Sequence, residues 1–241
     1  MKAHITHLTF DCYGTLIDWE QGILRALTTL LHRAGIKVRP EDLLRSFVDH
    51  EARIEAQPWR PYREVLREVL TGMAADFDLI LLNSEKHLLS ESLPHWPPFP
   101  DTIQALQQLA KNFRLVIVSN TDDALFAGTQ QTLGIQFDQV ITAEQVRSYK
   151  PGQAHFKEVL RRLHVPISQI LHVAQSLYHD HAPAKQLGFQ TAWINRPSLL
   201  AETGLAPQAE ITPDLVFSNL SSLVAGLEQS SSVAQLGLKR S

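Results

Sequence analysis

The sequence has a single cysteine, Cys12, among its 241 residues. One thiol cannot form a disulfide within the chain, which excludes a scaffold held together by internal disulfides. No apolar run reaches the roughly 18 to 20 residues that a membrane-spanning helix needs. The first residues, MKAHITHLTF, lack the layout of a signal peptide, because Asp11 interrupts the short apolar stretch. We therefore expect a cytoplasmic protein that does not bind a membrane.

The sequence also lacks any cluster of charges of one sign. The chain has 22 Lys and Arg against 25 Asp and Glu, giving a net charge of −3, and both signs are spread along it. No basic face or polybasic cluster is present, so we expect no nucleic-acid partner. With 44% hydrophobic and 20% charged residues, the composition is that of an ordinary globular protein. The length suits one large domain or a core with a modest insert.

Short apolar runs alternate with helical patterns over most of the chain. This alternation predicts an α/β fold, a Rossmann-like doubly wound parallel sheet with helices on both faces. The expected strands are 5–10, 114–119, 138–143, 170–174, 190–195 and 214–219. The expected helices between them are 101–112, 124–134, 151–164 and 181–188.

One region breaks the alternation. From about residue 18 to residue 96 the pattern is almost wholly helical, and the proline-rich stretch PHWPPFP (94–100) closes it. A segment this long does not belong between two neighbouring strands. The sequence therefore predicts a core domain of residues 1–17 and 97–241, with residues 18–96 inserted as an α-helical cap subdomain.

Polar residues follow several of the expected strands. Asp11 ends the first strand, Ser119 and Asn120 end the second, and Asp180 follows the ILHVA run; Lys150 precedes a helix. In a doubly wound sheet, ligands bind beyond the carboxyl ends of the strands. A carboxylate that a lysine keeps ionised there can attack a substrate and form an ester intermediate. These residues are the candidates for a catalytic site with a covalent nucleophile.

Four motifs in order, DCYGTL, IVSN, SYKPG and VAQSLYHD, resemble those of the haloacid dehalogenase superfamily of hydrolases, over almost the whole chain. Tyr13 in the first motif resembles the type II (L-2-haloacid) dehalogenases. The resemblance implies Asp11 as the nucleophile, with Asp180 pairing with Lys150 or positioning water. The residues it implies for orienting the nucleophile and the substrate carboxylate are Thr15, Ser119, Lys150 and Ser176. Those it implies for further substrate contacts are Tyr13, Asn120, Phe156 and, from the cap, Arg45 or else Arg39.

The same resemblance leaves two functions open. Phosphatases of the superfamily carry an aspartate at the position of Tyr13, as the acid for the leaving oxygen, and another at Gln175 that helps to hold Mg²⁺. A halide leaves as a stable anion and needs no acid. We therefore expect cleavage of carbon–halide bonds in small 2-haloacids, as by an (S)-2-haloacid dehalogenase, with a small-molecule anionic substrate and no cofactor. The alternative is a Mg²⁺-dependent phosphatase whose metal site is Asp11, the Tyr13 carbonyl and Asp180.

A third alternative, a non-catalytic binding protein on the same scaffold, also stays open. Members of the family are often dimers, so a homodimer is one expectation that no sequence pattern decides. Three features depart from the dehalogenase pattern, and one of them is Ala174-Gln175-Ser176, where the fourth motif of those enzymes reads roughly Ser-Ser-Asn. Phe156 stands where those enzymes have a tyrosine, and the loop that leads to Asp180 holds an extra residue.

Plainer roles compete for the same residues. Asp11 and Asp180 could each cap a helix, and a lone Lys150 would ordinarily be solvated. Arg45 lies in an amphipathic helix rich in charges, where an ion pair is slightly favoured over a halide contact. The histidines His172, His179 and His181 lack a recognised zinc-binding spacing, so no metal is expected there.

Overall fold

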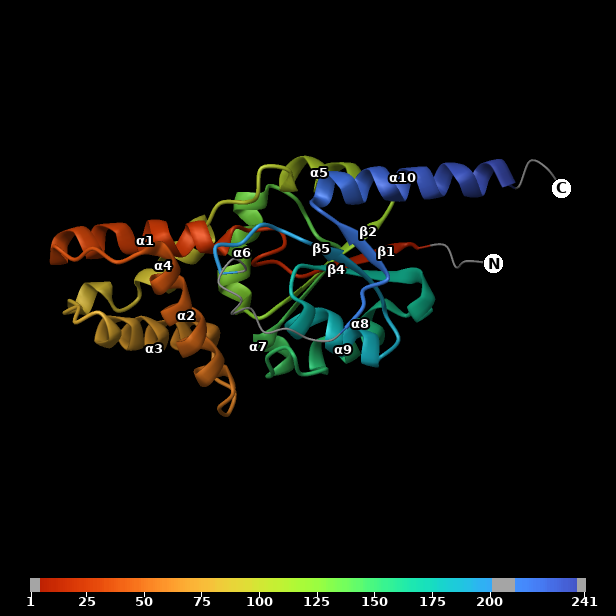
Figure 1. Ribbon diagram of the computed structural model, residues 1–241. Helices are drawn as coiled ribbons and strands as arrows, with labels where there is room; N and C mark the ends of the chain where they lie inside the picture. Colours follow the sequence, from red (N-terminus) through yellow and green to blue (C-terminus); the bar gives the residue numbers. More distant parts are fainter. Residues whose placement is uncertain (1–4, 201–210, 238–241) are drawn as a thin grey trace.

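The structure of the protein is a computed structural model that describes residues 5–200 and 211–237 (Figure 1). Its centre is a six-stranded sheet in the order β3-β2-β1-β4-β5-β6, and all neighbouring strands are parallel. The strands are β1 (His7–Phe10), β2 (Arg114–Ser119), β3 (Gln139–Thr142), β4 (Ile170–Ala174), β5 (Gln190–Ile194) and β6 (Leu215–Phe217). All six lie inside the ranges expected from the sequence.

The strand order reverses at β1, in the middle of the sheet. β1 pairs with β2 on one side and with β4 on the other, and Phe10 is level with Ile117 and Val173. This reversal is the topological switch point, where doubly wound folds bind their ligands. Asp11 is the next residue after β1, so it lies at the switch point.

Helices cover both faces of the sheet (Figure 1). α5 (Thr102–Leu109) and α10 (Leu220–Gly237) lie against one face, and α8 (Ala154–Leu163) and α9 (Ala182–Gln186) against the other. Side chains of β2 alternate accordingly: Ile117 joins the apolar cluster that contains Leu106 of α5, whereas Val118 joins the cluster that contains Phe156 of α8. The doubly wound α/β fold is confirmed. The remaining core helices are α6 (Asp123–Leu133) and α7 (Ala143–Val146).

The segment between β1 and β2 begins with four helices that lie together to one side of the sheet (Figure 1). They are α1 (Trp19–Ala34), α2 (Pro40–Glu55), α3 (Tyr62–Asp76) and α4 (Leu88–Ser92), with short 3₁₀ turns at Asn83–Glu85 and Leu93–His95. Asp18 caps α1 by accepting a hydrogen bond from the Gln21 amide, and Gly35 ends the helix in the left-handed region, with φ at 69°. We call these helices the cap.

The chain enters and leaves the cap along two adjacent stretches. The amide of Asp18 donates to the carbonyl of Pro97 at 2.8 Å, and the amide of Phe99 donates to the carbonyl of Leu16 at 3.1 Å. This paired connection lies at the boundaries expected from the sequence. We keep the division into a cap of residues 18–96 and a core as a proposal.

For the described parts of the chain, no helix combines the length and the apolar character that a membrane span requires.

Candidate active site

Lys150 joins two carboxylates at the switch point. Its Nζ donates to Asp11 Oδ1 at 2.8 Å, to Asp180 Oδ1 at 2.6 Å and to the Val118 carbonyl at 3.0 Å. Asp11 follows β1 and Val118 belongs to β2, while Asp180 lies in the turn Leu177–His181 that follows β4. All three charged residues are buried. The structure thus brings together three residues that are far apart in the sequence and places one positive charge between two negative ones.

Thr15 fixes the second oxygen of Asp11. Its hydroxyl donates to Asp11 Oδ2 at 2.7 Å and accepts a hydrogen bond from the backbone amide of Gln175 at 2.9 Å. The chain turns back sharply enough to do this because Gly14 has a φ of 97°, which side chains other than glycine rarely tolerate. Both carboxylate oxygens of Asp11 therefore accept a hydrogen bond, and its orientation is set by the sheet and by the turn that follows it.

The ionisation of the three groups follows from burial and mutual attraction. Burial raises the pKa of Asp11 above its ordinary value, while the Lys150 ammonium opposes this effect. Burial also acts to raise the pKa of Asp180, but Lys150 and His172 reverse the effect, and its pKa lies below the usual value. Burial acts to lower the pKa of Lys150, and the two carboxylates raise it above the usual value. Lys150 is therefore a permanent cation, and it holds Asp180 as a permanent anion.

Asn120 holds the backbone of Lys150. Its Oδ1 accepts a hydrogen bond from the Lys150 amide at 2.8 Å, and its Nδ2 donates to the Lys150 carbonyl at 3.2 Å. Ser119, the last residue of β2, is completely buried, and its hydroxyl has no hydrogen-bond partner among the described residues. A buried hydroxyl without a partner is costly in a folded protein, so Ser119 is a free donor beside Asn120.

A widened helical turn carries Asp180. Residues Leu177–His181 form a π-helical turn in which the amide of His181 donates to the carbonyl of Ser176, five residues earlier. The hydroxyl of Ser176 accepts from the amide of His179 at 3.0 Å and so caps this turn. The hydrogen bonds of the Ser176 hydroxyl are made to His179, and the structure does not join it to Asp11 or Lys150.

Phe156 requires a correction. We expected it to contact the substrate, but it is completely buried beneath the sheet. Its ring packs edge-on against His172 at 4.9 Å and against Phe189 at 5.6 Å, measured between ring centroids. The reason is the helical period of α8, which turns Phe156 towards the sheet together with Val159. Phe156 therefore packs against His172 within the core and is not exposed to a ligand.

Tyr13 and Arg45 make contacts other than those expected with a substrate. The hydroxyl of Tyr13 forms a 2.9 Å hydrogen bond with Thr129 of α6, and its ring packs edge-on against Trp96. Burial raises the pKa of Tyr13 well above its usual value. Arg45 has an exposed fraction of 40% for its side chain, and its guanidinium lies 3.8 Å from Asp42 on the same helix. The structure thus gives Arg45 the ion-paired role that the sequence slightly favoured.

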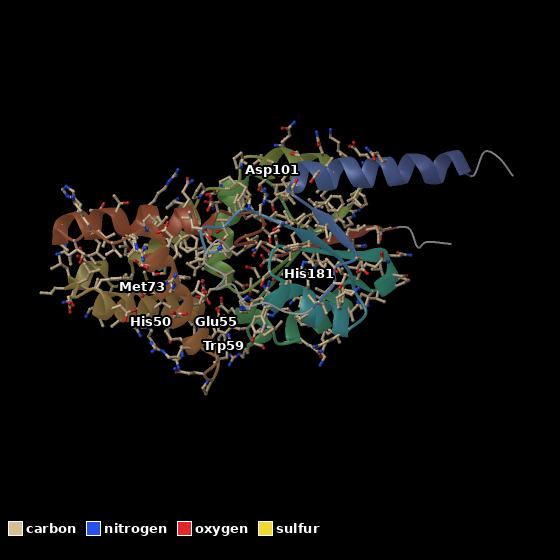
Figure 2. All side chains as sticks on the ribbon, in the orientation of Figure 1. His50, Glu55, Trp59, Met73, Asp101 and His181 are labelled. Atoms are coloured by element: carbon tan, nitrogen blue, oxygen red, sulfur yellow. The ribbon has the colours of Figure 1, made fainter. Side chains whose placement is uncertain are left out.

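Two carboxylates of the cap approach the site, and the sequence analysis did not identify them. Glu55 Oε2 accepts a hydrogen bond from Asn120 Nδ2 at 3.4 Å, which links the end of α2 to the core. In Figure 2, Glu55 lies on the side of the cap nearer the sheet. Glu51, one helical turn earlier, accepts a hydrogen bond from the hydroxyl of Tyr62. Burial raises the pKa of Glu51 to about 7 and raises that of Glu55 well above its usual value. Their spacing of four residues was the available signal, since it places both on one helix face.

The residues at the switch point do not fit a metal site. Among the residues that the structure describes, there is no group of three His, Cys, Asp or Glu side chains that could hold a metal ion. The Lys150 ammonium bridges Asp11 and Asp180, and Gln175 offers a neutral amide, which is a weak ligand for a hard cation. We therefore derive no catalytic step through a metal.

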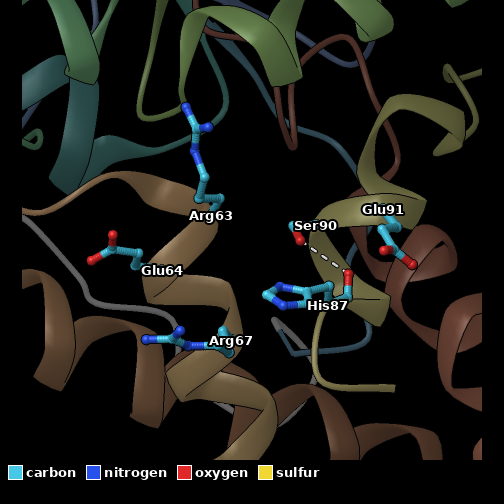
Figure 3. A pocket seen from close by; sticks show the side chains of 6 residues that line it. All are labelled: Arg63, Glu64, Arg67, His87, Ser90 and Glu91. Atoms are coloured by element: carbon cyan, nitrogen blue, oxygen red, sulfur yellow. Dashed lines mark hydrogen bonds between the residues drawn. The ribbon is translucent and has the colours of Figure 1, made fainter. Parts of the chain in front are cut away.

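A separate hollow lies within the cap. Figure 3 shows it between α3 and the turn that leads into α4, and it is lined by Arg63, Glu64, Arg67, His87, Ser90 and Glu91. None of the residues around Asp11 contributes to it. Its lining mixes both signs of charge, and Arg63 is already paired with Asp122.

Comparison with known proteins agrees with this geometry. The profile of the haloacid dehalogenase-like hydrolase family matches residues 5–188, and the chain belongs to this family. It is 27% identical to an (S)-2-haloacid dehalogenase of Pseudomonas putida over 91% of this chain and 95% of that protein. It is 31% identical to the 5-amino-6-(5-phospho-D-ribitylamino)uracil phosphatase YigB of Escherichia coli, over 92% and 96%.

A solved structure shares the fold. The L-2-haloacid dehalogenase of Xanthobacter autotrophicus, with chloropropionic acid covalently bound, superposes with a TM-score of 0.78. The two chains are 22% identical, and the match covers 93% of this chain and 98% of that one. The expected family and fold are thus confirmed, and the chain is a hydrolase of this family.

Proposed function

We propose that this hydrolase cleaves carbon–halide bonds in small 2-haloacids through an ester on Asp11. The observation that carries the proposal is the arrangement of Asp11, whose two oxygens accept hydrogen bonds from Lys150 and Thr15 at the end of β1. A carboxylate fixed in this way is oriented for attack, and the adjacent ammonium favours its ionised, nucleophilic form. The similarity to several (S)-2-haloacid dehalogenases supports the choice of substrate.

The first step is a displacement at carbon. An oxygen of Asp11 bonds to C2 of the acid while the carbon–halogen bond breaks, and the halide leaves with the electron pair. No proton is transferred in this step, so no acid is needed at position 13, where Tyr13 is bonded to Thr129 instead. The free hydroxyl of Ser119 is suited to receive the carboxylate of the substrate.

The second step releases the product. Water adds its oxygen to Cγ of Asp11, the bond between Cγ and the ester oxygen breaks, and a proton of the water passes to that oxygen to give the 2-hydroxy acid. The Asp11 carboxyl then loses its remaining proton to solvent. The cap, which Glu55 links to Asn120, would limit the entry of water during the first step.

The direct test is halide release from 2-chloro- and 2-bromopropionate. We expect turnover with the (S) enantiomer that EDTA does not change, and a loss of about 10⁴-fold or more in Asp11→Asn, which removes the nucleophile with little change in shape. Mass spectrometry of a quenched single turnover should show the acid attached to Asp11. A panel of 2-haloacids that yields no halide with the wild-type protein would refute this function.

A phosphatase is the second candidate, and the 31% identity to the Escherichia coli phosphatase favours it. Release of phosphate that requires added Mg²⁺, from phosphorylated sugars or sugar alcohols, would support it over dehalogenation. Tyr13 cannot protonate a leaving oxygen readily, since burial raises the pKa of its hydroxyl, so this activity should be weak. Measuring halide and phosphate release side by side, with and without Mg²⁺, separates the two functions.

A further inference from the structure

His172 lies beneath the site in a place that an apolar residue would ordinarily occupy. It is in the middle of β4, completely buried, and it is directly opposite Thr9 of β1 in the parallel register. Both side chains point to the same face of the sheet, and the Nδ1 of His172 lies 2.9 Å from the hydroxyl of Thr9. The Phe156 ring packs against the edge of the imidazole and restricts it further. The ring is therefore held on two sides.

The other nitrogen of this ring reaches the site. Nε2 of His172 lies 3.1 Å from Asp180 Oδ1. An ionised carboxylate only accepts hydrogen bonds, so Nε2 carries the hydrogen and donates it, whether the ring is neutral or charged. Lys150 donates to the same oxygen at 2.6 Å. Lys150 and His172 therefore both donate to Oδ1 of Asp180, and together they fix the orientation of the carboxylate. Neither of these two hydrogen bonds involves Oδ2.

Asp180 needs this support because its own segment is unusual. It lies in the π-helical turn of Leu177–His181, in which hydrogen bonds span one more residue than in an α-helix. Lys150 alone could not define the orientation of Asp180, since its ammonium is also shared with Asp11 and the Val118 carbonyl. His172 belongs to strand β4, and its ring is held by Thr9 of β1. It therefore offers Asp180 a second hydrogen-bond donor in a fixed position.

We propose that His172 is a positioning residue for the second step of the reaction. Through its hydrogen bond it orients Asp180 so that the free Oδ2 accepts a hydrogen bond from the water that attacks the ester on Asp11. Thr9 in turn fixes the imidazole. The first step, in which Asp11 displaces the halide, does not need this orientation. The inference rests on the proposed function, because it requires an ester intermediate.

The experiment separates the two steps with His172→Met, which keeps the volume and removes the donor. After rapid mixing with (S)-2-chloropropionate, we expect a burst of halide close to one equivalent, at a rate within about threefold of the wild type. Steady-state turnover should fall about 10- to 100-fold, by analogy with the loss of a hydrogen-bond partner that orients a metal ligand. The ester on Asp11 should accumulate and be visible by mass spectrometry.

Three further variants exclude a merely structural effect. His172→Gln can place its amide nitrogen near the position of Nε2, so it should recover a large part of the turnover. Thr9→Val, which removes only the hydroxyl that holds the ring, should slow the second step by a smaller factor. His32→Gln, on the exposed surface of α1, is the matched control and should behave like the wild type. Melting temperatures report whether each variant is folded.

The possible failures are distinguishable. If His172→Met slows the burst and the turnover equally, or if no ester accumulates while the protein remains folded, His172 does not act on the second step and the inference is wrong. The same conclusion follows if His172→Gln is no better than His172→Met. If the wild-type protein itself releases no halide, the proposed function fails and this inference fails with it.

Discussion

The carboxylates of the core and those of the cap differ in how their charge is balanced. In the core, Asp11 and Asp180 share the ammonium of Lys150, and every contact is 3.1 Å or shorter. In the cap, Glu51 and Glu55 receive hydrogen bonds from neutral donors, and neither has a cationic partner at ion-pair distance among the described residues. In the core, one ammonium therefore compensates two carboxylates in part and holds both of them in place. The cap presents acidic groups whose ionisation depends on pH and on what enters between the two parts.

The largest effect is expected from removing the cation of the core. Lys150→Met removes the cation that bridges two buried carboxylates. Leaving a buried charge without its partner costs about 3–5 kcal/mol, so the free energy of unfolding at pH 7 should fall by that amount. Urea denaturation followed by circular dichroism measures it.

The control for this variant is Lys157→Met on the exposed side of α8, where a change within about 0.5 kcal/mol is expected. Equal stability of the two variants would mean that Lys150 does not compensate the carboxylates. The core and the cap would then not differ in the way described above.

A smaller effect is expected at the cap end of the site. Glu55→Gln keeps an oxygen that can accept from Asn120 but cannot become negative. At pH 9, where more of Glu55 is ionised in the wild type, the variant should bind an anionic substrate better, with a KM lower by about fivefold, equivalent to about 1 kcal/mol. At pH 6 the difference should be smaller, because the raised pKa of Glu55 favours its protonated form as the pH falls.

The matched control is Glu64→Gln, an exposed residue of α3. It should leave KM unchanged at both values of pH. A KM for Glu55→Gln that equals the wild-type value at pH 9 would show that the cap carboxylate does not face the bound anion.

A further effect concerns the pH dependence of stability and the carboxyl group of Glu51. Its pKa is about 7 in the folded protein, above the ordinary value of 4.5, so the folded state binds this proton more tightly than the unfolded state. The resulting stabilisation is complete below pH 4.5 and is lost as the pH rises through 7. Glu51→Gln has no proton to lose. It should equal the wild type near pH 4.5 and exceed it at pH 8.5 by up to about 3 kcal/mol in urea denaturation, because one pKa unit corresponds to about 1.4 kcal/mol. A difference that does not change with pH would contradict this.

Much of the fold and the centre of the site could be predicted from the sequence. Alternating strands and helices define the sheet, and residues at strand ends must meet at one edge, which is why Asp11, Lys150 and Asp180 were found together. The order of residues along the chain does not show which strands are adjacent in the sheet, or which residues of adjacent strands are paired. The pairing of Thr9 with His172 depends on β1 and β4 being adjacent, so His172 was missed.

The errors have a similar origin. Phe156 was assigned to the substrate from its place in a motif, whereas the rotation of α8 about its axis decides that it faces the sheet. Glu51 and Glu55 were overlooked because their significance arises only when the cap lies against the core. Local patterns therefore predict elements and strand ends well, but not the contacts that depend on how separate elements are packed.

The π-helical turn at Leu177–His181 has a consequence for how related chains are compared. Inserting one residue into an α-helix rotates everything after it by about 100°. A single wide turn takes up one more residue than an α-helical turn, and within it Asp180 reaches Lys150 just before α9 begins. Counting positions from the start of this motif therefore does not by itself identify the residue of a related chain that corresponds to Asp180. The residue equivalent to Asp180 in a related structure is the carboxylate that accepts a hydrogen bond from the lysine equivalent to Lys150.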